Sequence, residues 1–223
     1  MPLQNMSLRK LLKIMFLPAR AQQSALRTDI REERAREAPD QNDEGGGDFY
    51  APFWADAKAH AFGEGDLRDL VADRIASNGR RAKLYPLLRD GFLLWWNQRR
   101  RWTNQPFQPG RVLRARHGIP ALDAVVKIDS IMSVRDADGV EHYVYPYFAP
   151  EPPLSDEAAR FALWLLGQAL PDVPHGELRI LDVIRGRTFS IDRVPLHGDE
   201  EAQFHERYAA LLRQRDHLRG GPT

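Results

Sequence analysis

The sequence predicts an α+β fold in which a helical N-terminal half is followed by a small mixed or antiparallel sheet with flanking helices. Apolar residues recur at helical spacing near the N-terminus and again over residues 67–75. Further along, two pairs of β-rich runs are each joined by a short turn, which is typical of β-hairpins. Between them, residues 158–166 are apolar nearly all round, which predicts a buried helix.

Length and composition exclude several classes of protein. A chain of 223 residues with 43% hydrophobic residues is long enough to bury a full core. The absence of cysteine excludes disulfides, zinc-thiolate sites, iron-sulfur clusters and a cysteine nucleophile, and it makes the reducing cytoplasm the expected location. No apolar run approaches the roughly 20 residues of a spanning helix, so we expect no membrane span. Lys13 interrupts the apolar N-terminal stretch, so export is not expected either.

The N-terminal segment, residues 1–48, is expected to form an amphipathic helical arm and a polar, glycine-rich linker in front of one globular domain over residues 49–223. The apolar face of the arm comprises Leu8, Leu11, Leu12, Met15 and Phe16. Such a helix can dock on its own domain, on a protein partner or a second copy through residues 1–20, or on a membrane surface. Residues 27–44 predict a polar helix, and the three glycines that follow predict a flexible linker.

The central helical part has clear boundaries in the sequence. Asp66 is placed to cap a helix that begins at Leu67, and Asn78 with Gly79 is placed to end it. Pro86 fits the first turn of the next helix, which is apolar and aromatic and leads into three consecutive arginines.

A basic strip runs from residue 79 to residue 116, with ten basic residues against the single acid Asp90. Residues 117–223 carry an acidic excess, so the formal net charge of +1 is a cancellation between two regions. Arginines on two successive elements form a surface that suits phosphate groups, with a tryptophan available for base stacking. The candidate nucleic-acid-binding residues are Arg99, Arg100, Arg101, Trp102, Arg111, Arg114 and Arg116.

Two other interpretations of the strip stay open. Cations are favourable at the C-terminus of a helix in any protein. The strip could also meet the acidic C-terminal half of its own chain, or an acidic partner in a multi-subunit assembly, because arginine pairs with carboxylates and stacks on aromatic rings.

From residue 111 onward the expected order is a strand, a hairpin, a buried helix, a second hairpin and a final helix. The corresponding segments are 111–116, 124–134 with 140–148, 155–170, 178–184 with 188–194, and a helix from Asp199. Asp136 to Gly139 form the first hairpin turn, and Ser155 is placed to cap the buried helix. Glu200 and Glu201 fit the first turn of the last helix, where the helix dipole favours acids, so we assign them a structural role.

The order of elements and a few residues resemble the RecB-type branch of the PD-(D/E)XK nuclease superfamily. Lys127 to Ile131, with Asp129 in the middle, followed by Asp138-Gly139 and a second strand, is similar to the second-strand aspartate, the hairpin turn and the third strand of that family. Ala158 to Leu170 is similar to the helix that follows. The resemblance implies a restriction-endonuclease-like fold, with Asp129 as candidate catalytic and metal-binding residue.

The resemblance implies magnesium held by a pair of carboxylates and a lysine that steadies the attacking water. Where the family places that second carboxylate and the lysine, this chain has Tyr145-Pro146-Tyr147. We therefore expect a degenerate, non-catalytic domain without a cofactor; a magnesium-dependent nuclease is the alternative, and an ordinary strand-surface role for Asp129 is another. Pro146 predicts that its strand is an edge strand or bulged, because proline lacks a backbone donor.

Overall fold

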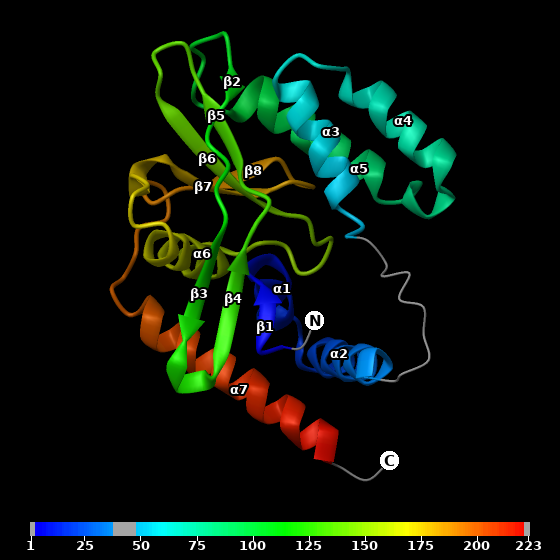
Figure 1. The fold of residues 1–223 in the computed structure, drawn as a ribbon, viewed down its shortest axis with the longest axis vertical. Coiled ribbons are helices and arrows are strands. Elements are labelled where there is room, and N and C mark those ends of the chain that lie inside the picture. The colour runs from blue at the N-terminus through cyan, green and yellow to red at the C-terminus, as the bar shows by residue number, and fades with distance from the viewer. Residues whose placement is uncertain (1–2, 38–47, 221–223) are drawn as a thin grey trace.

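The structure is a computed structural model that describes residues 3–37 and 48–220 (Figure 1). In this part of the chain it contains seven α-helices and two mixed sheets, which confirms the predicted α+β class. The helices are α1 (Leu8–Phe16), α2 (Ala19–Glu37), α3 (Ala51–Ala61), α4 (Leu67–Ser77), α5 (Tyr85–Leu94), α6 (Asp156–Ala169) and α7 (Glu200–Gly220). The strands are β1 (Asn5–Ser7), β2 (Gln108–Pro109), β3 (Ala115–Ile119), β4 (Ala124–Ile128), β5 (Met132–Arg135), β6 (Glu141–Tyr147), β7 (Leu178–Asp182) and β8 (Arg187–Phe189).

The two sheets differ in size and meet where β4 is followed by β5. The smaller sheet has the order β1-β4-β3, with β1 parallel and β3 antiparallel to β4. The larger sheet has the order β2-β5-β6-β7-β8, in which only β6 and β7 are parallel. α6 forms the crossover between these two parallel strands, as parallel pairing requires.

A sharp bend separates β4 from β5, although the sequence predicts one continuous run over residues 124–134. Ser130 adopts a left-handed conformation with φ 65°, which turns the chain out of the first sheet. The carbonyls at the bend receive hydrogen bonds from α3: Trp54 Nε1 donates to Ser130 O at 2.6 Å and Lys58 Nζ donates to Ile131 O at 3.0 Å. These donors replace the strand partners that the bend removes.

Two hydrophobic cores lie on opposite faces of the larger sheet. Tyr143, Tyr145 and Tyr147 of β6 belong to the core that also contains α1, α6 and α7. Val144, between them, belongs to the aromatic core under α3, α4 and α5, because successive strand residues point to opposite faces. In Figure 1 the helices α3, α4 and α5 accordingly gather at one end, and α1, α2 and α7 at the other.

The N-terminal segment begins with a strand and a helix that pack on the rest of the chain. β1 pairs with β4, and the apolar face of α1 is buried in the first core together with Leu3 and Met6. Among the alternatives considered for this helix, the structure shows that it docks on its own domain. α2 begins at Ala19, ahead of the polar helix predicted over residues 27–44. Residues 38–44 of that prediction and the glycine-rich linker lie outside the described residues.

Several local predictions are confirmed. Asp66 caps α4 by accepting from Arg68 N, and Asn78 follows the last residue of the helix. Ser155 caps α6, which is buried as predicted, and the turn from Asp136 to Gly139 joins β5 to β6. No helix in the described ranges is long and apolar enough to cross a membrane.

β6, which contains Pro146, lies between β5 and β7 in the larger sheet, so it is not an edge strand along its whole length. Pairing of β5 with β6 ends at Met132 and Val144, however, because the bend carries the chain away. On the other side Tyr147 O accepts from Val183 N at 2.9 Å. Pro146 thus sits where β6 has lost its β5 neighbour, and the missing donor breaks no ladder bond there.

Candidate functional site

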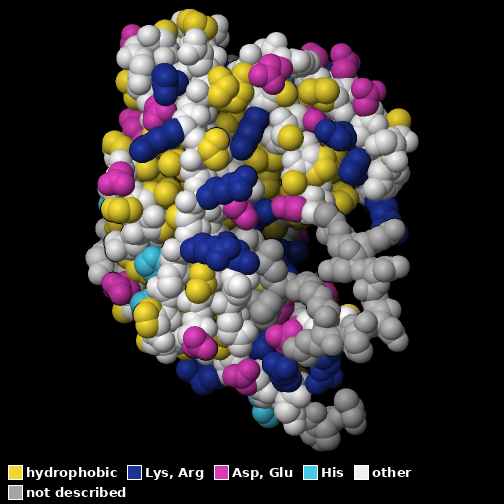
Figure 2. All heavy atoms as spheres, viewed as in Figure 1, with side chains coloured by type: hydrophobic (Ala, Val, Ile, Leu, Met, Phe, Trp, Pro, Cys, Tyr) yellow, Lys and Arg dark blue, Asp and Glu magenta, His cyan; other side chains and the backbone are white. Residues whose placement is uncertain are grey.

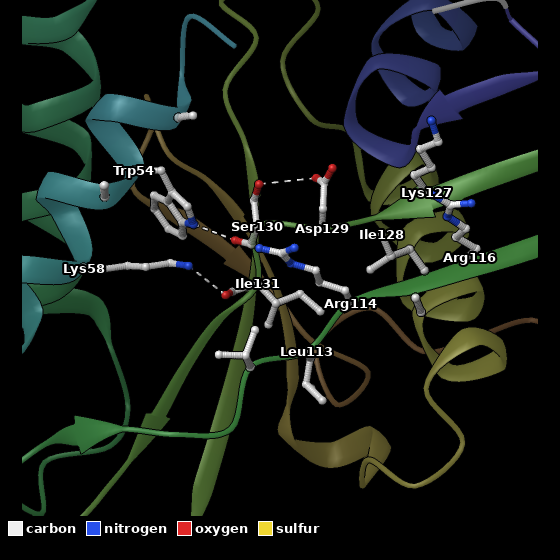
Figure 3. Close-up of a pocket in the computed structure, with 14 residues that line it drawn as sticks. Trp54, Lys58, Leu113, Arg114, Arg116, Lys127, Ile128, Asp129, Ser130 and Ile131 are labelled. Atoms are coloured by element: carbon white, nitrogen blue, oxygen red, sulfur yellow. Dashed lines mark hydrogen bonds between the residues drawn. The ribbon is translucent and has the colours of Figure 1, made fainter. Parts of the chain in front are cut away.

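A pocket of about 730 Å³ opens at the junction of the two sheets (Figure 3). α3 forms one wall, the chain entering β3 forms another, and β4 with the bend that follows it forms the third. The lining residues are Ala51, Trp54, Ala55, Lys58, Val112, Leu113, Arg114, Ala115, Arg116, Lys127, Ile128, Asp129, Ser130 and Ile131. Its volume lies within the range of small-molecule binding sites.

Four cationic side chains line this pocket, against one carboxylate. Lys58 comes from α3, Arg114 and Arg116 from the chain at β3, and Lys127 from β4 (Figure 3). The formal excess is three positive charges. Arg116 and Lys127 are direct cross-strand partners, so their side chains lie close together on one face of the sheet.

Two of these cations have no ionic or hydrogen-bonding partner among the residues that the structure describes. Within residues 3–37 and 48–220, neither Arg114 nor Arg116 forms an ion pair or a hydrogen bond. Burial lowers the pKa of the Lys58 ammonium, and the nearby Arg114 lowers it further. Lys58 is partly buried and both arginines are exposed to solvent, so their positive charges are available to a bound anion.

The single carboxylate of the pocket, Asp129, is already paired. Arg9 Nη1 of α1 donates to Asp129 Oδ1 at 2.8 Å and to Ser130 Oγ at 3.2 Å, and its other terminal nitrogen pairs with Asp48. Ser130 Oγ donates to the same Asp129 oxygen at 3.3 Å. Arg9 thus neutralises the acid that would otherwise repel an anion.

Charge on the molecular surface follows the same pattern. In Figure 2, Lys and Arg side chains form a column down the middle of the face towards the viewer, with hydrophobic side chains on both sides and few acids between them. Val112, at the pocket, is 85% exposed. Cations beside open apolar surface are the combination that a nucleotide, with its phosphate and its flat base, can use.

The structure does not bring the six predicted arginines together. Arg99 donates to the carbonyls of Arg185 and Gly186 at 3.1 and 3.3 Å. Arg100 stacks over the rings of Trp96 and Phe107, with its Cζ 4.1 and 4.4 Å from the two ring centres, and burial lowers its pKa.

Arg101 and Arg111 are also engaged inside the domain. Arg101 pairs with Asp192, and a hydrogen bond from Ser190 together with this pair lowers the pKa of Asp192 to about 2. Arg111 Nε donates to Tyr143 OH at 3.0 Å and lies 3.4 Å from Glu141 Oε2. Of the six arginines, Arg114 and Arg116 alone line the pocket.

Trp102 lies inside the aromatic core instead of at an open surface. It is 8% exposed, and its ring stacks on His142 with 4.5 Å between the ring centres. Trp95 and Phe107 pack against it edge-on. The predicted base stacking by Trp102 is therefore not available in this conformation.

The residues around Asp129 do not fit a magnesium ion. One carboxylate is a poor ligand set for this ion, and here a guanidinium already occupies its oxygen. β6 contributes Tyr145 beside Arg9, and its hydroxyl accepts a hydrogen bond from Arg9 N at 3.0 Å. Positions that would carry the second carboxylate and the lysine hold aromatic rings and Pro146.

A second group of potential metal ligands has a structural explanation. His197, Asp199 and Glu200 are the one cluster of three such residues in the described part of the chain. Both oxygens of Glu200 accept backbone hydrogen bonds, from His197 N at 2.7 Å and Gly198 N at 3.0 Å. This arrangement ties the loop before α7 to the first residue of the helix, and Glu200 lies in the first turn of α7 as predicted.

Sequence reasoning missed Lys58, Lys127 and Arg9. A signal existed for Lys127, because it alternates with the buried residues of β4 and so shares the face on which its cross-strand neighbour Arg116 lies. Lys58 and Arg9 reach the bend from helices far away in the sequence. No local pattern predicts that approach.

The site combines cations from three elements with a partly apolar wall, and it offers no paired carboxylates, so its chemistry suits binding of phosphate groups better than bond cleavage. Comparison of the chain with models of protein families, with curated proteins and with solved structures gives no match.

Proposed function

We propose that the protein is a non-catalytic nucleic-acid-binding protein, or the nucleic-acid-binding subunit of a larger complex, and that it holds backbone phosphates in the pocket beside the β4–β5 bend. The observation that carries this proposal is the pair of arginines, Arg114 and Arg116, that line one pocket with two lysines and have no anionic partner among the described residues. A guanidinium can bind a phosphate group through two parallel hydrogen bonds.

A polymer is favoured over a single small anion by the extent of the basic surface. In Figure 2, Lys and Arg side chains follow one another along one face of the molecule. Successive phosphates along a strand can engage cations spaced in this way, and each contact releases counterions from the nucleic acid. A cytoplasmic location, expected from the absence of cysteine, is compatible with such a partner.

An inactive nuclease-like fold is part of the proposal. The support for it is the order of elements along the chain, β3, β4, β5, β6, α6, β7 and β8, although β3 and β4 lie in a separate sheet from β5 to β8. In that scheme Arg9 stands where a nuclease would hold its metal, next to Asp129. Loss of the metal and retention of the phosphate contacts would leave a binding protein.

The test is a titration of binding against salt concentration with a fluorescent oligonucleotide. Arg114→Gln combined with Arg116→Gln should weaken binding and reduce the slope of log K against log salt by roughly 1.5, because two phosphate contacts are lost. Arg101→Gln is the matched control, since the charge of Arg101 is already compensated by Asp192. No binding at low salt, or equal effects of both variants, would refute the proposal.

A protein partner is the second candidate, and the exposure of Val112 favours it. A valine that is 85% exposed next to arginines suits an apolar and acidic partner surface, including that of a second copy. Sedimentation of the wild type and of Val112→Asp would test self-association. A monomer at every concentration would remove this form of the alternative.

A further inference from the structure

A second hollow of about 540 Å³ adjoins the first pocket, and Asp129 lines both. It opens between the start of α1, the start of α3 and the chain that follows β6. Its lining residues are Met6, Ser7, Arg9, Lys10, Lys13, Glu32, Asp48, Tyr50, Asp129, Phe148 and Ala149. The two hollows lie on either side of the bend that Arg9 and Trp54 hold in place.

The two hollows differ in charge. The first has an excess of three positive charges, whereas the second has three cationic and three acidic side chains, so its formal charge is balanced. Two of its acids, Asp48 and Asp129, are paired with Arg9. A phosphate gains little in such surroundings, but a neutral group with hydrogen-bonding edges fits them.

Aromatic rings form one wall of the second hollow. Tyr50 stacks on Phe148 with 4.8 Å between the ring centres and 7° between the planes, and Trp54 packs edge-on against Phe148. Phe148 is 2% exposed, whereas Tyr50 is half-buried and lines the hollow. Tyr50 is therefore a flat ring held in a fixed orientation by the core behind it.

We propose that the ligand is single-stranded nucleic acid, with its phosphates in the first pocket and one unpaired base in the second, stacked against Tyr50. This inference rests on the proposed function and adds which form of nucleic acid is bound. A base in a duplex is stacked between its neighbours and cannot enter a hollow of this size, whereas a base in a single strand can turn out and stack on a protein ring.

The experiment compares a single strand of about ten nucleotides, as DNA and as RNA, with the blunt duplex of the same sequence, at one salt concentration. We expect the single strand to bind roughly tenfold tighter than the duplex, in at least one of the two chemistries. Abasic substitution at each position in turn should then weaken binding about tenfold at the position whose base occupies the second hollow.

Tyr50→Ala decides whether that base contacts this ring. In the variant the abasic penalty should vanish, because the base has lost its stacking partner, while Tyr50→Phe should keep the penalty. A purely structural role for Tyr50 would weaken binding of all strands equally and leave the abasic penalty unchanged, which would overturn the inference.

The outcomes separate the two proposals. Absence of binding by both strand forms contradicts the proposed function itself. Duplex binding as tight as single-strand binding, still dependent on Arg114 and Arg116, overturns this inference and leaves the proposed function intact. The comparison of strand forms uses the wild-type protein, so it decides the matter even if Tyr50→Ala does not fold.

Discussion

Arg9 Nη1 donates to Asp129 Oδ1 at 2.8 Å, and this ion pair joins the first turn of α1 to the end of β4. The Arg9 side chain is 13% exposed and also contacts Ser130 Oγ and Asp48. Burial opposes its charge, but Tyr145, Asp129 and Asp48 outweigh burial and hold the pKa of Arg9 above its ordinary value. Asp129 therefore has a permanent protein cation as its partner.

Replacing Asp129 by asparagine should tighten nucleic-acid binding. The change removes the one acid that lines the cationic pocket and keeps the size of the side chain. We expect a gain of roughly 0.5–1 kcal/mol, about two- to fivefold in Kd, because the removed charge is partly screened by solvent. Fluorescence anisotropy with the same oligonucleotide measures the Kd of the wild type and of the variant.

The same variant distinguishes a binding protein from a metal-dependent nuclease. A nuclease that relies on Asp129 would cleave nucleic acid with magnesium and lose this activity in Asp129→Asn. Asp73→Asn on α4 is the control, because Asp73 is exposed and does not line the pocket. Weaker binding by Asp129→Asn, with Asp73→Asn unchanged, would contradict our assignment.

As pH rises, the affinity for nucleic acid should begin to fall at a lower pH than the titration of an unperturbed lysine would predict. Burial and Arg114 lower the pKa of Lys58 below 10.5, and neutral Lys58 cannot pair with phosphate. Lys58→Arg should flatten this part of the profile, because arginine stays protonated. A wild-type affinity that is constant up to the pH at which free lysine titrates would contradict the role of Lys58.

The free energy of unfolding of the unbound protein should also depend on pH through Lys58, but it should rise with pH where the affinity for nucleic acid falls. Between the lowered pKa of Lys58 and 10.5, the unfolded chain binds more protons than the folded one. The contribution of Lys58 to the free energy of unfolding therefore rises with pH in this window. Urea unfolding of the wild type and of Lys58→Met across it measures the difference.

Much of the fold could be predicted because its signals are local. Asp66 and Ser155 cap helices, and Asp136 to Gly139 form a turn, through chemistry within a few residues. The bend at Ser130 could not be predicted. Its left-handed backbone depends on donors from α3 more than 70 residues away in sequence, which give the exposed carbonyls their partners.

The site was predicted only in part, because arginines that are close in the sequence do not have to lie together on an exposed surface. The guanidinium of Arg100 stacks over the ring of Trp96, and Arg101 pairs with Asp192, 91 positions away in the sequence. Of the predicted site residues, Arg114, Arg116 and Asp129 reach the pocket. The N-terminal helix was predicted as amphipathic. The periodicity of its apolar residues shows that it has an apolar face, but not which part of the protein covers that face.

Gly91→Ala should destabilise the protein strongly. A Cβ at Gly91 in α5 would lie 2.1 Å from Val183 O and 2.2 Å from Ile184 O, so the helix would have to move away from the backbone after β7. We expect a loss of about 1–3 kcal/mol or more, as for other overpacked sites. Gly79→Ala is the control, because a Cβ there meets nothing within 4 Å. Equal free energies of unfolding for the two variants would show that α5 does not approach β7 as closely as described.

Arg215→Ala should separate α7 from α2. Arg215 is fully buried and its Nε donates to Asp29 Oδ2 at 3.2 Å, while its Nη2 pairs with Glu33. Removing the guanidinium leaves Asp29, which is 2% exposed, with Lys10 as its remaining partner at 3.5 Å. Breaking one side of a buried pair costs about 3–5 kcal/mol, and urea unfolding should show a loss of this order. Arg213→Ala, at an exposed position of the same helix, should change the free energy of unfolding by less than about 0.5 kcal/mol. If both variants unfold at the wild-type midpoint, the α2–α7 contact does not contribute to stability, and the position of α7 must depend on its apolar face alone.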